Sequence, residues 1–211
     1  MSSAAPADGG LRARRRALTE LDIETAALAA VEADGFEATT MDQIAARAGV
    51  SVRTAFRYFP AKVDTVLFSA RQVSLLIEAG FEGALGESPS LIEVEDSIAA
   101  SLAALVESDA DVIARLKRLR TLMLSDGRLR AEVAKSEGYQ AGMTGIADDD
   151  GDNRLRLQLI SEVCAATLRS AFDNWADAAG SDSELVAHYR LARELRDELV
   201  GRRSQLRQSG A

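Results

Sequence analysis

The stretch TMDQIAARAGVSVRTAFRYFPAK, residues 40–62, decides the fold of the first part of the chain, because it contains two helix starts separated by a glycine turn. Thr40 and Gln43 form a capping box, in which side chains and backbone donors at a helix start satisfy each other. Gly49 has the conformational freedom that ends this helix, and Ser51 is a good N-cap for a second one. Pro60 stops the second helix. The stretch therefore predicts two short helices joined by a tight turn.

The second helix has two different faces on a 3.6-residue wheel. One face combines apolar side chains and is expected to pack against the rest of the domain. The other carries polar and basic side chains and is expected to point outward. The packing face holds Val52, Ala55, Phe56 and Phe59, and the outward face holds Arg53, Thr54, Arg57 and Tyr58.

The same region is locally basic in a chain whose formal charge is −8. From Gln43 to Val63 there are four cations and no carboxylate: Arg47, Arg53, Arg57 and Lys62. Lys and Arg displace condensed counterions from DNA, so this reversal of charge suits phosphate contact. A charge run alone is usually only a solvated face. Together with the glycine turn and the capped short helix, it predicts a DNA-reading helix-turn-helix.

Residues 35–62, GFEATTMDQIAARAGVSVRTAFRYFPAK, resemble the DNA-binding signature of the TetR/AcrR family of transcriptional repressors. The resemblance covers about the first third of the chain. It implies that Thr40 caps a helix beside a phosphate, that Lys62 contacts a phosphate, and that Val52, Arg53, Thr54, Phe56 and Tyr58 face the major groove or its backbone. The sequence FRYFP, residues 56–60, also resembles that of regulators linked to mycofactocin clusters and acyl-CoA ligands.

Two residues depart from the family pattern. The family usually has Tyr where Phe56 stands, so a phenolic hydrogen bond is missing, and Ala55 is smaller than the usual Leu or Ile. The wheel places Phe56 inside, whereas the resemblance places it near DNA, and the sequence leaves both open. The expected DNA-binding residues are Thr40, Ser51, Val52, Arg53, Thr54, Phe56, Arg57, Tyr58 and Lys62, together with Arg14, Arg15 and Arg16.

Composition predicts an all-α chain of 211 residues, since it has 47% apolar residues, three prolines, and no convincing strand pattern. Residues 1–62 hold eight cations and eight carboxylates, and the remainder holds 17 and 25, so the acidity belongs to the second part. No apolar run approaches the roughly 20 residues that span a bilayer, and the start lacks the apolar core of a signal peptide. We therefore expect a cytoplasmic protein without membrane contact. A single cysteine, Cys164, excludes an internal disulfide framework.

The chain is expected to have four parts. Residues 1–15 form a flexible basic arm, 16–60 the three-helix DNA-binding domain, 61–204 a larger helical ligand-binding and dimerisation domain, and 205–211 a tail. The arginines of the arm either begin a solvated helix or contact phosphates or the minor groove. Across the whole chain we expect about nine helices, and those outside the helix-turn-helix fall at about 16–33, 61–82, 90–107, 109–124, 127–146, 154–178 and 183–200.

Three details of the body follow from these helices. In the helix at 109–124 the basic residues Arg115, Lys117, Arg118 and Arg120 are expected largely outside. Tyr139 and Met143 are expected in the core more than in a cavity. The acidic run 148–153 is no EF-hand, because it has Asn153 where Gly is needed and Leu159 where Glu is needed, so no metal is expected.

The helix at 154–178 is apolar on two sides, and a helix of that kind must be covered on both. One row contains Leu157, Ile160, Cys164, Leu168, Ala171 and Trp175, and the other contains Leu155, Leu159 and Val163. The resemblance implies that the last two helices pair with their copies in a homodimer. The expected dimer interface contains Leu155, Leu159, Val163, Leu185, Tyr189 and Leu195.

No catalytic residue is assigned, because no nucleophile elbow, phosphate-binding glycine loop or CxxC pair is present, and no cofactor is expected. His188 is expected at a surface or interface. The leading hypothesis is a homodimeric repressor that binds a palindromic double-stranded operator and responds to an unknown small, apolar effector. The alternatives are an architectural DNA-binding protein of the same fold, and a helical small-molecule-binding protein or enzyme with a vestigial motif.

Overall fold

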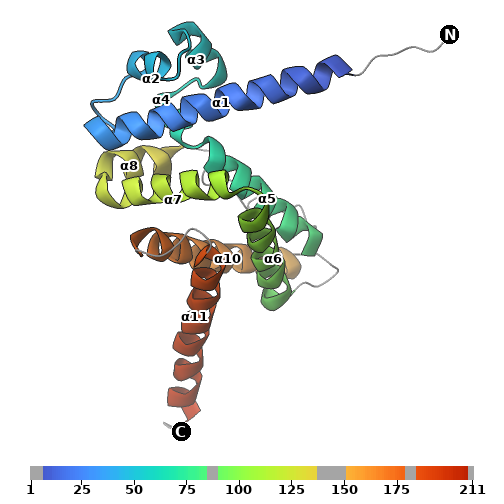
Figure 1. Ribbon diagram of the computed structural model, residues 1–211. Coiled ribbons are helices and arrows are strands. Elements are labelled where there is room, and N and C mark those ends of the chain that lie inside the picture. Colours follow the sequence, from blue (N-terminus) through green and yellow to red (C-terminus); the bar gives the residue numbers. More distant parts are fainter. Residues whose placement is uncertain (1–6, 85–89, 137–150, 179–183, 209–211) are drawn as a thin grey trace, which may run out of the picture.

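The computed structural model describes residues 7–84, 90–136, 151–178 and 184–208, and these residues form helices joined by short turns (Figure 1). The described part contains ten helices and no strand, which confirms the all-α prediction. The helices are α1 (Ala7–Asp34), α2 (Met41–Arg47), α3 (Val52–Tyr58), α4 (Lys62–Val66), α5 (Phe68–Ala84), α6 (Leu91–Ser108), α7 (Ala110–Ser125), α8 (Gly127–Lys135), α10 (Gly151–Asp177) and α11 (Leu185–Gln208).

The N-terminal domain is built on α1, the longest helix of this part. In Figure 1, α2, α3 and α4 lie along one side of α1, whereas α7 and α8 lie along another. Ile23, Ala27 and Leu28 of α1 are fully buried together with Ile44 and Ala45 of α2. This small core fixes α2 and α3 on α1 because side chains packed at crystal-like density leave no freedom to slide.

The body is centred on α7, which packs against α1, α5, α6, α8 and α10. Its buried residues Ile113, Leu116 and Leu119 recur at helical spacing, as the sequence predicts. Trp175 of α10 is fully buried at the same centre. Helix α7 therefore contacts both α1 of the reading domain and α10 of the body.

Several helix bounds differ from the predicted ones. Helix α1 begins at Ala7 rather than near residue 16, so residues 7–15, expected as a flexible arm, are helical. Arg, Leu and Ala are good helix formers, and they extend the helix despite two glycines. The helix predicted over 61–82 is divided at Leu67 into α4 and α5. Helix α11 continues to Gln208, into the predicted tail, while Tyr139, Met143 and the acidic run 148–153 lie outside the described residues.

The arginines of α7 are not largely outside, and here the prediction was wrong. The side chain of Arg120 is 7% exposed and pairs with Asp173 of α10, and Arg115 pairs with Glu24 of α1. The wheel failed because α7 is covered on several sides, so a polar residue there must find a buried partner instead of water.

Candidate DNA-binding interface

The start of α2 has the predicted capping box. Thr40 has extended backbone angles, its Oγ1 accepts the Gln43 N–H at 3.3 Å, and Gln43 Oε1 accepts the Thr40 N–H at 2.8 Å. Each group satisfies a donor that the helix itself leaves unpaired. Thr40 is exposed, so this helix start faces solvent.

The turn and the start of α3 also agree with the sequence. Gly49 has φ +69°, in the left-handed region that a side chain disfavours, which explains glycine at this position. Ser51 Oγ accepts the Thr54 N–H at 3.1 Å, and the two hydroxyls lie 2.8 Å apart. The helix-turn-helix is therefore fixed by interactions that each span three residues.

The two faces of α3 are those predicted except at Phe56 and at Tyr58, which is half-buried and packs against the core instead of pointing outward. Ala55 and Phe59 are buried, Val52 packs against the core, and Arg53 and Arg57 are exposed. Phe56 is 48% exposed, so its assignment to the packing face was wrong. The small side chain of Ala55 makes the contact with the core, and Phe56, one position further round the helix, projects into solvent. This exposure agrees with the position that the resemblance implies.

Tyr58 connects α3 to the basic segment of α1. The guanidinium carbon of Arg57 lies 5.1 Å from the centroid of its ring, and that of Arg16 lies 5.5 Å from it. Cations near an aromatic face are attracted by its quadrupole. Arg16 also pairs with Glu20 at 2.9 Å, while Arg14 and Arg15 are exposed. Of the predicted accessory arginines, Arg16 therefore lies beside α3, and all three belong to helix α1.

Lys62 is engaged within the protein. Its Nζ donates to the carbonyl oxygens of Phe36 at 2.6 Å and Thr39 at 2.8 Å, approaches that of Glu37 at 3.5 Å, and lies 4.2 Å from the centre of the Phe36 ring. Burial lowers the pKa of Lys62, although Glu37 raises it. The sequence gives no sign of this contact, because the partners are more than twenty residues away.

Asp126, between α7 and α8, joins the body to the turn that precedes α2. Its carboxylate accepts the N–H groups of Arg128 and Leu129 at 2.9 and 3.0 Å and that of Phe36 at 2.8 Å. These backbone donors, that of Leu129 first, hold the pKa of Asp126 below its ordinary value. One carboxylate therefore caps α8 and holds residue 36 of the reading domain.

A second junction, missed by the sequence reasoning, lies at Glu24 of α1. This carboxylate is 1% exposed, accepts the Ser69 N–H at 2.7 Å and its hydroxyl at 2.5 Å, and pairs with Arg115 of α7 at 3.2 Å. Burial raises the pKa of Glu24 more than Ser69 and Arg115 lower it. A carboxylate in the apolar row of a predicted helix is the only sequence signal that could have indicated this cluster.

The residues expected at a dimer interface fall into two groups. Leu155, Leu159 and Leu195 are exposed and Val163 is half-buried, whereas Leu185 and Tyr189 are fully buried within the protomer. Leu185 and Tyr189 therefore belong to the core of this chain, because α11 packs against α10 and α6 along their side. Cys164 is fully buried, as predicted, and burial raises its pKa to about 12. His188 Nδ1 lies 2.8 Å from Asn174 Oδ1.

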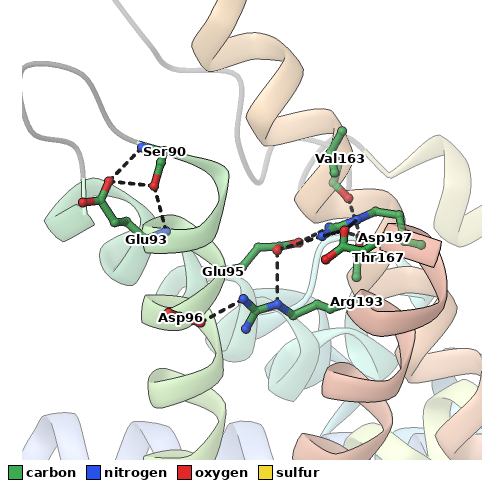
Figure 2. Close-up of polar contacts among 9 residues, drawn as sticks. Ser90, Glu93, Glu95, Asp96, Val163, Thr167, Arg193 and Asp197 are labelled. Atoms are coloured by element: carbon green, nitrogen blue, oxygen red, sulfur yellow. Dashed lines mark hydrogen bonds and ion pairs between the residues drawn. The ribbon is translucent and has the colours of Figure 1, made fainter. Parts of the chain in front are cut away.

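Ion pairs near the middle of α11 hold this helix against α6. Figure 2 shows Glu95 of α6 and Asp96 on either side of the Arg193 guanidinium, with Arg193 Nε 3.1 Å from Glu95 and Nη2 2.8 Å from Asp96. Arg196 also bonds the buried Glu95 carboxylate and the Thr167 hydroxyl of α10. Buried charges require such pairing. The cluster fixes the direction in which α11 leaves the body.

Two features are absent from the described residues. These residues hold no helix long and apolar enough to cross a membrane. They also hold no group of three or more His, Cys, Asp or Glu side chains placed to bind a metal ion.

Known proteins are similar to parts of this chain. Residues 23–67 match the model of bacterial regulatory proteins of the tetR family. Over 111 residues the chain is 32% identical to a protein of Mycobacterium tuberculosis named as the mycofactocin biosynthesis transcriptional regulator MftR; this match covers 52% of the chain and 54% of that relative, so the chain spans about half the length of the relative. A solved structure described as a TetR-family transcriptional regulator, from Mesorhizobium loti MAFF303099, aligns over 88% of this chain and 98% of its own, with 22% identity and a TM-score of 0.44. The segment that contains the helix-turn-helix is therefore similar to bacterial regulatory proteins of the tetR family.

Proposed function

We propose that the protein is a transcriptional repressor that binds a palindromic operator as a homodimer and releases it when a small, apolar effector binds the helical body. The observation that carries the proposal is the capped α3, whose Arg53, Phe56 and Arg57 side chains are exposed while Ala55 and Phe59 hold the helix on the domain. An exposed helix face with two arginines suits the major groove, where Arg reads guanine edges and phosphates.

Each residue of the interface has a role in this proposal. Arg53, Thr54 and Val52 read base edges, Phe56 contacts the thymine methyl group or sugar, and Arg57 and Tyr58 contact the backbone. Thr40 and Ser51 lie at exposed helix starts, which attract phosphates through free N–H groups. Arg14, Arg15 and Arg16 extend the contact to flanking phosphates or the minor groove.

The experiment is footprinting of purified protein on its own promoter region, followed by anisotropy titrations at fixed salt. The similarity to a mycofactocin biosynthesis regulator supports adding control regions of such genes to the first set of DNA fragments. Arg53→Ala with Arg57→Ala is expected to abolish the footprint. Arg130→Ala with Arg190→Ala is the matched control, since both residues are exposed on the body and the charge change is the same. If no palindromic site is protected, or if both double variants bind alike, the proposal fails.

The homodimer is supported by exposed apolar residues on the last two helices: Leu155 and Leu159 of α10 and Leu191, Leu195, Leu199 and Val200 of α11. The two helices pack against each other, and large exposed apolar surfaces on a soluble protein usually mark an interaction site. Sedimentation equilibrium measures the mass directly. A monomer at concentrations that saturate the operator would contradict this part of the proposal.

A further inference from the structure

Lys62, the first residue of α4, lies where three carbonyl oxygens converge. Its ammonium group has three N–H donors, and the oxygens of Phe36, Thr39 and Glu37 lie 2.6, 2.8 and 3.5 Å from Nζ. The Phe36 ring covers it at 4.2 Å. All three donors therefore have partners inside the protein, and a phosphate oxygen would have to displace one of them.

The carbonyls that Lys62 binds belong to the turn between α1 and α2. This turn follows the end of α1 at Asp34, contains Gly35 at φ +79°, and ends at the Thr40 cap of α2. The carboxyl end of a helix carries unpaired carbonyls and partial negative charge, which a nearby cation stabilises. Within the turn, Thr39 bonds back to the Gly35 carbonyl through its N–H at 3.2 Å and its hydroxyl at 2.8 Å. Lys62 therefore holds, from α4, the turn that connects α1 to α2.

We propose that Lys62 is a positioning residue: it sets the orientation of α2, and with it the Thr40 helix start, by binding the carbonyls of the turn, and it does not neutralise a DNA phosphate. The inference rests on the proposed DNA-binding function. It departs from the phosphate contact that the family resemblance implies for this lysine. A phosphate contact and a positioning contact both predict weaker binding when the ammonium group is removed, but they predict different salt dependence.

The first test compares wild type with Lys62→Met, which keeps most of the aliphatic stem, in operator titrations from low to moderate salt. Loss of one phosphate contact reduces the slope of log K against log[salt] by about 0.9. A positioning role weakens binding by about tenfold, the effect of losing hydrogen bonds to a charged group, and leaves the slope at the wild-type value. Arg57→Met removes an exposed cation of α3 and is the positive control, for which the salt slope is expected to fall. A slope reduced by about one contact in Lys62→Met overturns the inference.

The second test needs no DNA, so failure of the inference is separable from failure of the proposed function. Hydrogen–deuterium exchange of peptides covering residues 35–43 is measured in wild type and Lys62→Met. The variant is expected to exchange faster there, because the turn loses its support, while peptides of α6 stay unchanged. Equal protection of residues 35–43 in the two proteins overturns the inference whether or not an operator is known.

Discussion

Glu24→Ala is expected to destabilise the protein strongly, because the Glu24 carboxylate links α1 to both α5 and α7. Removing it strands the Ser69 N–H, in a residue that is 1% exposed, and leaves the Arg115 guanidinium without its 3.2 Å partner. Breaking a buried pair by removing one member costs about 3–5 kcal/mol. The Arg115 side chain is 15% exposed and keeps some water, so we expect the lower end, about 3 kcal/mol.

The assay is urea unfolding followed by circular dichroism at one fixed protein concentration, since dimerisation would make stability depend on concentration. A shift of the midpoint with an unchanged m-value reports a loss of stability alone. Glu20→Ala is the matched control: it lies on the same helix and removes an i,i+4 pair with the exposed Arg16, which is worth about 0.3–0.5 kcal/mol. If Glu24→Ala costs no more than Glu20→Ala, the assignment of Glu24 as a junction between the domains is refuted.

Three further predictions concern other sites. Asp126→Ala should lower the free energy of unfolding at pH 7 by about 1–2 kcal/mol through loss of a helix cap. Because the folded pKa of Asp126 lies below 3.8, the stabilisation by its carboxylate is present above about pH 3.8 and is lost as the pH falls further. Urea titrations of the wild type and the variant should therefore converge at pH values below the folded pKa. Phe56→Tyr should raise operator affinity several-fold with little effect on stability, because the 48% exposed ring gains a hydroxyl that can reach a phosphate, and equal affinities in anisotropy titrations would contradict this. Leu159→Glu should shift sedimentation toward the monomer, whereas Leu75→Glu, the same change at an exposed leucine of α5, should not; an unchanged mass for Leu159→Glu would remove that residue from the interface.

Polar contacts between distant helices connect the reading domain to the body in the described residues. Glu24 with Arg115 and Phe36 with Asp126 connect the two at separate points of α1 and of the turn that follows it. Glu95 with Arg193 does the same for α6 and α11 at the other end. A helical wheel of polar and apolar positions does not predict these contacts, because in each of them a polar group is paired with a distant helix instead of with water.

The sequence alone determined the local structure of the reading motif. The Thr40–Gln43 box, the Ser51 cap and the Gly49 turn are interactions within one helical turn, so residue types at fixed spacing are sufficient to predict them. The all-helical class and most of the apolar rows followed for the same reason, since a 3.6-residue period is visible in the chain itself.

Only the tertiary structure decided which individual side chains are buried and which groups they contact. Phe56 points to solvent because Ala55 takes the place in the core, and Leu185 and Tyr189 are buried because α10 and α6 cover that side of α11. Lys62 donates to the Phe36 carbonyl, 26 residues away in the sequence, and Asp126 accepts the Phe36 N–H, 90 residues away. Such contacts depend on how helices pack, and packing is a property of the whole chain that no short window of sequence contains.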